Sequence, residues 1–355
     1  MKIGILTFAN AYNYGAVLQC YALYKTLSDN GFDVSVINYR PYYMNPRFPR
    51  PPLRVFLKFQ FIKGVRIYRD SVLFYTKFKD FISSNTVFTR KCSNFEQINL
   101  AISDYDYIVL GSDQVWTKKH NKFDPVWYGG YGKAQWIGYA VSAGDCLFQN
   151  DEIDRFQDCL KKYKAISVRE DILSKFIKTV INRGAPVVLD PTLLADRNIW
   201  NKWTKPILDE KYILVYQARQ SNKVFSVAEK LSMEIGNCKI IPVCGWPNVY
   251  ESGYKRFCAS PSDFISLIKN AQYVVTTSFH ATAFSIILGT QFFTVKLNDG
   301  ADERCEHLLQ LLDLKMRLVE SDDFTSHNTI DFQLVYEKLD KYRLDSMNFI
   351  VESLT

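Results

Sequence analysis

The sequence predicts an α/β fold in which two Rossmann-like, doubly wound domains face each other across a cleft, and three observations predict it. The chain has 355 residues, more than one hydrophobic core usually supports. Short apolar segments alternate with helical patterns along both halves, as in parallel sheets. Residues 196–211 between the two series are polar, so we expect an N-terminal domain at 1–200 and a C-terminal domain at 201–327.

The first series opens with a β-α-β unit. Residues 3–8 predict a buried strand, 15–30 a helix with regularly spaced apolar residues, and 32–39 a second strand. Further strands are expected at 107–110, 136–140, 165–168 and 187–189. Small or polar residues follow these strands, and in a parallel sheet the loops after the strands lie on one edge. The first domain should therefore present its polar loops together.

The second series begins with a strand at 212–216. The elements expected after it are a helix at 222–235, a strand at 239–244, a helix near 261–269, a strand ending before Ser278 and the helix that follows. Residues 328–355 predict a terminal helix, which can cross back to the first domain. Ligands in doubly wound folds bind outside the carboxyl ends of the strands, so we expect a site shared by the two halves.

One segment of the first half has a different composition. Residues 46–79 hold nine Lys/Arg against one acid, with eight Phe/Tyr among them, and predict a basic aromatic helical excursion at about 46–90. One interpretation is contact with an anionic membrane or a lipid-linked acceptor. The other, which we favour, is a helix packed on the domain by its aromatic side.

Composition limits the classes of function. The net charge of +7 is moderate, which favours an anionic ligand and argues against a dedicated nucleic-acid binder. Eight cysteines are scattered without a CxxC pair, which indicates reduced thiols and no metal site. The apolar stretch at the N-terminus is too short for a signal peptide, and no long apolar run follows. We expect a cytoplasmic protein, with peripheral contact at the inner membrane face as an alternative.

The most informative stretch is residues 276–290, TTSFHATAFSIILGT, which follows an apolar strand and contains one of the four histidines. Ser278 and His280 would then lie at the carboxyl edge of the second sheet, in the first turn of a helix. Free N–H groups and the helix dipole at such a position favour an anionic ligand. A histidine packed in the core is the alternative for His280.

Two charged residues of the first half are further candidates. Arg169 follows a short apolar strand and can bind a carboxylate or phosphate with two N–H groups, although a surface arginine is common at such a place. Its neighbour Glu170 is expected to form an ordinary salt bridge. Asp113, in GSDQVW, can act as a general base or cap a helix.

The remaining candidates are weaker. Asn13 and Gly15 follow the first strand, and Ser142 and Gly144 follow the strand at 136–140. The glycines allow tight turns and let a ligand approach the backbone. Two arginines after the second sheet can reach an anion, although exposed helix arginines usually do not: Arg304 and Arg317.

Six blocks together resemble the polysaccharide pyruvyl transferases, in order and over about residues 3–300. They are NYGAVLQCYAL, GSDQVW, YAVSAG, SVRED, LDPTLL and SFHATAFSIILGTQF. The resemblance implies a fold like the GT-B glycosyltransferases. It also implies transfer of pyruvate from phosphoenolpyruvate (PEP) to two hydroxyls of a sugar as a cyclic ketal, with release of phosphate, in surface or capsular polysaccharide synthesis.

The resemblance also implies residue roles. The histidine thought to act as acid or base in the family corresponds to His280, and the arginine implicated in binding the PEP anion corresponds to Arg169. Many members have an arginine where this chain has Phe279. The residues suit the chemistry, which needs one acid or base and a strong anion clamp, with PEP as donor substrate and no cofactor or metal.

Two other functions stay open. A GT-B glycosyltransferase that uses a nucleotide sugar can have the same architecture, because a fold does not determine a function. A non-catalytic scaffold of a polysaccharide assembly complex is the second. The expected partners are PEP and a sugar acceptor on a lipid-linked saccharide, and no nucleic acid.

Overall fold

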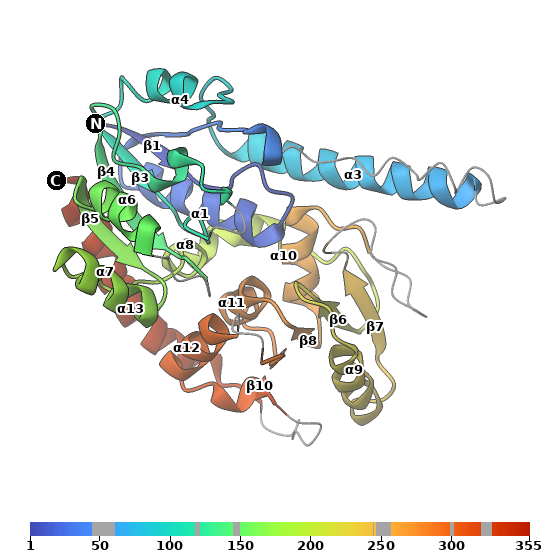
Figure 1. The fold of residues 1–355 in the computed structure, drawn as a ribbon. Coiled ribbons are helices and arrows are strands. Elements are labelled where there is room, and N and C mark those ends of the chain that lie inside the picture. Colours follow the sequence, from blue (N-terminus) through green and yellow to red (C-terminus); the bar gives the residue numbers. More distant parts are fainter. Residues whose placement is uncertain are drawn as a thin grey trace.

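The computed structural model describes residues 1–44, 61–117, 121–144, 150–243, 245, 257–298, 302–320 and 329–355. The chain forms two parallel five-stranded sheets with helices packed around each (Figure 1). This arrangement confirms the predicted α/β fold of two doubly wound units. Residues 46–60 of the expected basic excursion lie outside the described residues.

The first sheet has the strand order β2-β1-β3-β4-β5, all parallel. Its strands are β1 (Lys2–Leu6), β2 (Asp33–Val36), β3 (Tyr107–Leu110), β4 (Gln135–Val141) and β5 (Tyr163–Val168). Buried apolar residues fill β1, β3 and β4 because helices cover both faces of the sheet. The order reverses between β1 and β3, where doubly wound folds bind ligands.

The second sheet repeats this topology with the order β10-β9-β8-β6-β7. Its strands are β6 (Tyr212–Tyr216), β7 (Lys239–Val243), β8 (Tyr273–Thr276), β9 (Phe292–Val295) and β10 (Leu318–Val319). Here the order reverses between β6 and β8. Each half therefore contributes one switch point, and the helix after β8 begins at the second of them.

Helices occupy the connections between strands. They are α1 (Tyr14–Asp29), α3 (Phe61–Asn85), α4 (Phe95–Ala101), α6 (Asn150–Leu160), α7 (Asp171–Ile181), α8 (Pro191–Leu194), α9 (Asn222–Glu234), α10 (Pro261–Asn270), α11 (Phe279–Leu288), α12 (Glu303–Leu311) and α13 (Phe332–Leu354). Polar caps determine where the two helices nearest the switch points begin. The Asn13 side chain accepts from the N–H of Ala16, and the Ser278 side chain accepts from the N–H of Ala281.

A shared aromatic core joins the two halves. Tyr14 of α1 stacks on Phe264 of α10 with ring centroids 4.3 Å apart, and its hydroxyl donates to the carbonyl of Ala259 at 3.0 Å. Trp200 packs edge-on against Phe284 of α11 at 4.9 Å. Because these side chains belong to one buried cluster, the halves are held in contact through a dry interface.

Helix α13 connects the second half back to the first. Val335 and Leu339, in its first turns, belong to the core shared by the halves. Ile350 and Leu354, in its last turns, pack with Ile3 of β1 and neighbouring strands. The two ends of the chain accordingly lie on the same side of the molecule (Figure 1).

Helix α3 packs by its aromatic side along its second half. Phe74, Phe78 and Phe81 are buried, and Lys77 donates to the carbonyl of Cys258 at 2.9 Å. The beginning of the helix extends away from the body of the molecule (Figure 1). Among the described residues, no helix combines the length and the apolar character that crossing a bilayer requires.

The segment expected as a strand at 187–189 is not one. Val187 forms only an isolated bridge with Val168, and the N–H of Val188 donates to the Val168 carbonyl. Prolines at 186 and 191 limit regular pairing here because they lack the N–H that a strand ladder needs. The segment nevertheless runs beside the end of β5 and brings Asp190 next to Arg169.

Candidate active site

A buried guanidinium joins three loops of the first half. Arg169, directly after β5, donates from Nη1 to Oδ2 of Asp190 at 2.7 Å and from Nη2 to Oδ1 of Asp113 at 3.3 Å. Its exposed fraction is only 5%. Burial alone would lower the pKa of Arg169, but Asp190 and Asp113 outweigh it and raise the pKa above its usual value. The guanidinium therefore stays charged.

Asp190 lies at the centre of the site. It caps α8, where its Oδ1 accepts from the N–H and the hydroxyl of Thr192, while its Oδ2 also accepts from the Ser112 hydroxyl at 3.3 Å. Burial would raise the pKa of Asp190, yet the neighbouring His280 and Arg169 and the Thr192 N–H hold it far below its usual range. This carboxylate is ionised at neutral pH.

His280 reaches the same carboxylate from the second half. It stands in the first turn of α11, with Nε2 3.7 Å from Oδ2 of Asp190. That separation is too long for a hydrogen bond but fits an ion pair with a protonated imidazole. Nε2 is buried and has no hydrogen-bond partner among the described residues. The imidazole is thus placed against a permanent negative charge.

Gly15 makes the approach of His280 possible. A Cβ atom built on Gly15 would lie 2.0 Å from Nδ1 of His280, closer than real atoms come. The imidazole therefore packs directly on the backbone of the first turn of α1. The helices that follow the two switch points meet here at their N-terminal ends, with Asn13 and Ser278 as their caps.

Asp113 lies in a turn after β3 rather than at the start of a helix, so it does not cap one. Its backbone is left-handed, with φ at 79°. Burial would raise the pKa of Asp113, but Arg169, His280 and Arg304 outweigh it and lower the pKa below its usual value. Asp113 is accordingly a second ionised carboxylate beside Arg169.

Glu170 is paired differently from the expected salt bridge. No ion pair joins it to Arg169 among the described residues; the Ser142 hydroxyl donates to its Oε1 instead. Its Oε2 is buried without a partner in the part of the chain that the structure describes. Burial raises the pKa of Glu170 above its usual value, although Arg169 and Ser142 oppose the shift.

Ser142 and Gly144 form the turn that supports Glu170. The N–H of Gly144 donates to the Ser142 hydroxyl at 3.2 Å, and Gly144 has a φ of 64°. A Cβ on Gly144 would lie 2.8 Å from Nε2 of Gln114. Both features require glycine at this position, so its observed role is in the backbone turn.

The two arginines after the second sheet have different surroundings. Arg304 on α12 lies over the ring of Phe279, with its guanidinium carbon 5.8 Å from the ring centroid. Arg317 is not an exposed helix residue as expected: it is buried over Phe293 and donates to the side chain of Gln291 at 3.2 Å. Arg304 therefore reaches the site, and Arg317 belongs to the core of the second half.

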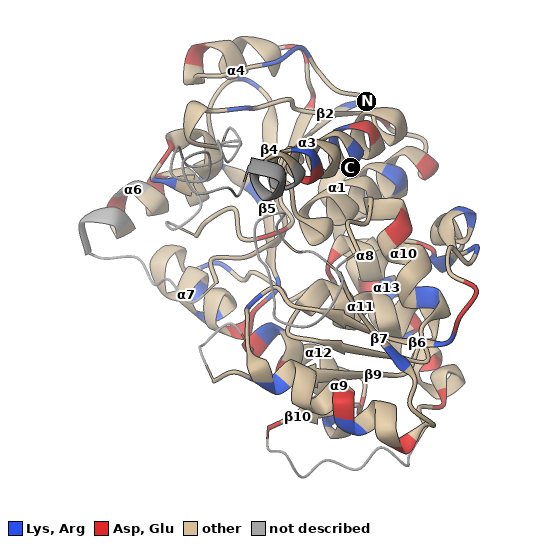
Figure 2. Ribbon diagram, turned by 90° about the vertical axis from the view of Figure 1, so that its right-hand side faces the viewer, with Lys and Arg blue, Asp and Glu red and all other residues tan. Residues whose placement is uncertain are grey.

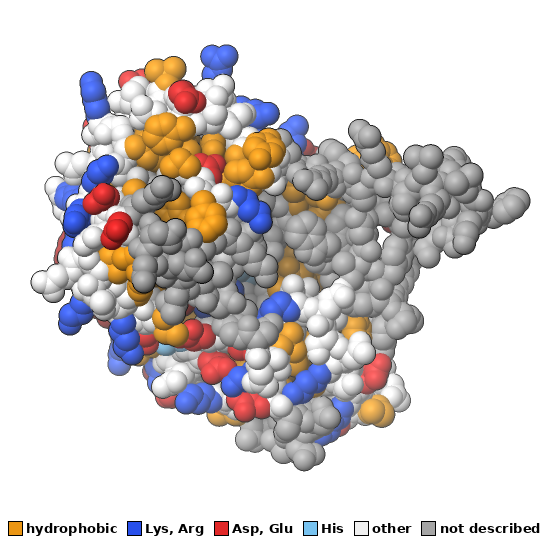
Figure 3. Space-filling model, in the orientation of Figure 1, with side chains coloured by type: hydrophobic (Ala, Val, Ile, Leu, Met, Phe, Trp, Pro, Cys, Tyr) orange, Lys and Arg blue, Asp and Glu red, His pale blue; other side chains and the backbone are white. Residues whose placement is uncertain are grey.

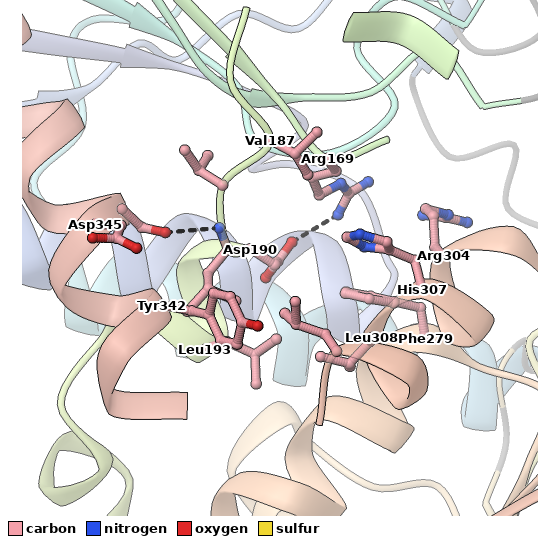
Figure 4. A pocket seen from close by; sticks show the side chains of 14 residues that line it. Arg169, Val187, Asp190, Leu193, Phe279, Arg304, His307, Leu308, Tyr342 and Asp345 are labelled. Atoms are coloured by element: carbon pink, nitrogen blue, oxygen red, sulfur yellow. Dashed lines mark hydrogen bonds and ion pairs between the residues drawn. The ribbon is translucent and has the colours of Figure 1, made fainter. Parts of the chain in front are cut away.

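A cavity of about 270 Å³ adjoins these residues, between the two halves and α13. Figure 4 shows Arg169, Arg304 and His307 at one end of it and Asp345 at the other. Its lining is formed by Arg169, Val187, Val188, Leu189, Asp190, Leu193, Phe279, Arg304, His307, Leu308, Leu311, Tyr342, Asp345 and Ser346. On the face drawn in Figure 3, by contrast, the described Lys/Arg and Asp/Glu side chains are interspersed, and the ribbon in Figure 2 shows both charges spread over many elements.

The structure brings most of the expected residues together. Five of them lie around one point: Asp113, Arg169, His280, Gly15 and Arg304. Two more, Ser278 and Asn13, cap the helices that meet there. Ser142 and Gly144 are one step removed, behind Glu170.

Sequence reasoning missed Asp190 as a site residue. The signal was available in LDPTLL, where an aspartate precedes a proline at the start of a helix and follows an apolar segment. It also missed His307, which has no local signal beyond its place on α12. Among the described residues, no group of three or more His, Cys, Asp or Glu side chains is placed to hold a metal ion.

Solved structures resemble this chain at low sequence identity. The UDP-GlcNAc 2-epimerase from Neisseria meningitidis aligns with a TM-score of 0.50 and 11% identity, over 100% of this chain and 99% of that one. The ADP-heptose lps heptosyltransferase II of E. coli aligns with a TM-score of 0.40 and 10% identity, over 97% and 99% of the chains. At this identity the likeness to the epimerase concerns the fold alone, which is the predicted GT-B-like arrangement.

No curated protein matches the sequence. The profile of the family described as polysaccharide pyruvyl transferase matches residues 13–299, which is most of the chain. The matched range extends from the cap of α1 to beyond β9 and includes Asp113, Arg169, Asp190 and His280. The chain belongs to the polysaccharide pyruvyl transferase family.

Proposed function

We propose that this protein transfers pyruvate from PEP onto two hydroxyls of a sugar as a cyclic ketal and releases phosphate, in the synthesis of a surface or capsular polysaccharide. Family membership supports the class of reaction. The observation that carries the proposal is the meeting of the two halves at Asp190, where Arg169 of the first half and His280 of the second face one carboxylate. An anion clamp and an acid or base are the equipment that this reaction needs.

His280 is the proton donor of the proposal. The reaction begins when the methylene carbon of PEP gains a proton while a sugar hydroxyl attacks the adjacent carbon. The ionised carboxylate of Asp190 lies 3.7 Å from Nε2 and faces the ring during that transfer. Phosphate then leaves, the second hydroxyl closes the ring and releases its proton, and the products are the ketal and inorganic phosphate.

Arg169 binds an anionic group of PEP in this scheme. A guanidinium carries five N–H donors, and the ion pairs with Asp190 and Asp113 leave its Nε without a partner among the described residues. The N-terminal N–H groups of α11, which follow Ser278, favour the negative charge of the phosphate. The same helix end therefore serves the anion and places His280.

Asp113 is the proposed base for the attacking sugar hydroxyl. Its pKa is held below the usual value, so the carboxylate is ionised at neutral pH and can accept a hydrogen bond from the hydroxyl. Gly15 and Gly144, with Asn13 and Ser142, maintain the backbone around the donor rather than reacting with it. Arg304 is a further contact for the donor anion.

The proposed acceptor is a sugar on a lipid carrier, and the proposed reaction needs no cofactor. The exposed beginning of α3, where Tyr68 and Arg69 are exposed, is the proposed contact with an anionic membrane at the inner membrane face. Flotation with vesicles that contain anionic lipid at low salt tests this contact. Protein that stays with the unbound fraction at low salt would contradict it.

The reaction is tested by incubation with PEP and candidate lipid-linked saccharides. Mass spectrometry should detect a product heavier by pyruvate less water, together with one phosphate released for each ketal. Release of a nucleoside diphosphate from a nucleotide sugar, without any ketal, would indicate a glycosyltransferase instead. His280→Ala protein that remains folded should lose the product, whereas a scaffold would leave polysaccharide composition unchanged.

A further inference from the structure

One aromatic ring contacts two guanidinium groups from different halves of the molecule. The carbon at the centre of the Arg169 guanidinium lies 5.5 Å from the centroid of the Phe279 ring, and that of Arg304 lies 5.8 Å from it. Arg169 is neutralised by two carboxylates. Among the described residues, Arg304 forms neither an ion pair nor a hydrogen bond, so the ring is its defined contact.

Among the described residues no carboxylate forms a direct ion pair with Arg304, although Glu170 and Asp113 attract it from a greater distance. Burial, and then repulsion by Arg169, lower the pKa of Arg304 below its usual value. Its guanidinium faces the cavity between α12 and the segment after β5, where His307 is a neighbour (Figure 4). An anion bound there would relieve the repulsion between the two arginines and supply the partner that Arg304 lacks.

The cavity has the shape of a site for a small anion with an apolar part. Val187, Leu193 and Leu308 form an apolar wall beside the basic end. The opposite end carries Tyr342 and Asp345, which are exposed to solvent. A volume of about 270 Å³ is small for a nucleotide sugar and suits a ligand with a few carbon atoms.

We propose that Arg304 and His307 form the seat of the phosphoryl group of the donor, and that Phe279 is a positioning residue that holds Arg304 toward this seat. The identity of the donor rests on the proposed function; the anion seat itself rests on the geometry. A phosphoryl group is assigned here because its two charges and three oxygens can be shared by Arg304, His307 and the unpaired donors of Arg169.

Calorimetric titration with PEP, pyruvate and inorganic phosphate tests the seat. Arg304→Gln should weaken PEP and phosphate binding by about 10- to 100-fold, the range typical of lost hydrogen bonds to charged groups. Pyruvate, which has no phosphoryl group, should bind the variant within about twofold of its affinity for the unmodified protein, because a carboxylate held elsewhere makes no contact with residue 304. Lys315→Gln is the matched control: it removes one exposed positive charge of the same half, away from the cavity.

Two substitutions of Phe279 test its positioning role. Phe279→Leu removes the ring and should raise the KM for PEP by about three- to tenfold through loss of the cation–π contact, with a smaller change in kcat. Phe279→Tyr keeps the ring and should restore the KM. Thermal unfolding by circular dichroism shows whether the leucine variant is folded. If both variants have the same KM as the unmodified protein, the positioning role is wrong.

The outcomes separate this inference from the proposed function. Arg304→Gln protein that binds PEP and phosphate as tightly as Lys315→Gln protein would overturn the seat, even if pyruvate transfer is observed. Equal weakening of PEP and pyruvate would assign the carboxylate, not the phosphoryl group, to Arg304. If the unmodified protein binds phosphate through Arg304 but transfers no pyruvate, the seat stands and the proposed reaction is wrong.

Discussion

The imidazole Nε2 of His280 lies 3.7 Å from the carboxylate Oδ2 of Asp190, and the two residues come from opposite halves of the molecule. The same oxygen accepts a hydrogen bond from Arg169 at 2.7 Å. One buried carboxylate thus orients the proposed acid and the proposed anion clamp at once. This relationship leads to predictions that separate electrostatic roles from simple packing.

Asp190→Asn should remove both stability and activity. The amide leaves the buried charge of Arg169 without its shorter ion pair, and breaking such a pair costs about 3–5 kcal/mol in the free energy of unfolding. Loss of the charge beside His280 should also reduce turnover by about 100-fold or more. Urea unfolding and phosphate release measure the two effects.

The effect on stability has a defined pH dependence. The folded state holds the pKa of Asp190 well below its ordinary value of 3.8, so its contribution is present above about pH 4 and is lost as the pH falls further. The difference between the unmodified protein and Asp190→Asn should therefore shrink in acid. Asp209→Asn, at an exposed position, is the control and should change neither the free energy of unfolding nor the turnover.

Gly15→Ala should displace His280. The added methyl group would lie 2.0 Å from Nδ1, so the ring must leave its present position beside Asp190. A displacement of about 1 Å in a catalytic group can cost about 100-fold in rate. Gly184→Ala is the matched control because a Cβ there meets no atom within 4 Å. Turnover of Gly15→Ala equal to that of the control would show that the position of His280 does not matter.

Glu170→Gln should change how stability depends on pH. Burial raises the pKa of Glu170 above its ordinary value of 4.5 in the folded state, so its contribution to stability is present at low pH and is lost as the pH rises through the raised pKa. The glutamine does not ionise, so the variant does not lose this stability as the pH rises. Its side-chain oxygen can still accept the hydrogen bond from the Ser142 hydroxyl. Relative to the unmodified protein, the variant should gain stability between pH 4.5 and 8 in urea unfolding curves. A constant difference over this range would contradict a raised pKa.

Tyr14→Ala should loosen the contact between the halves. The substitution removes the ring stacked on Phe264 and the hydrogen bond to the Ala259 carbonyl. We expect a loss of about 3–5 kcal/mol in the free energy of unfolding, as for other large aromatic side chains in cores. Tyr42→Ala, at a position that is 85% exposed, should have little effect. Chemical unfolding followed by tryptophan fluorescence compares the two.

The framework of the fold was predictable because parallel strands buried on both faces appear as continuous apolar runs. Residues 212–216 were expected as a strand and form β6. The start of α11 was also predictable, since Ser278 is a typical helix cap before an apolar helix. The segment 187–189 was not, because its flanking prolines limit its pairing to a bridge.

The candidate site was predictable as a place but not as a set of contacts. Loops that follow parallel strands lie at one edge of the sheet. For this reason Asp113, Arg169 and His280 could be predicted to belong to one shared site. Which carboxylate pairs with Arg169 depends on how the loops pack, and local sequence carries no signal for it. The burial of Arg317 escaped prediction for the same reason: its partners, Gln291 and Phe293, belong to another element.

The packing of α13 has a consequence for biosynthesis. The first sheet leaves the ribosome early, yet Ile350 and Leu354, which pack with Ile3 and Ile5, follow the second sheet in the chain and are translated after it. Until α13 is translated, the nascent N-terminal half exposes the apolar surface that this helix covers in the folded protein. Either a chaperone shields that surface, or the half stays soluble with the surface exposed. The two sheets therefore cannot mature one after the other as independent modules, because α13, which follows the second sheet in the chain, completes the core of the first.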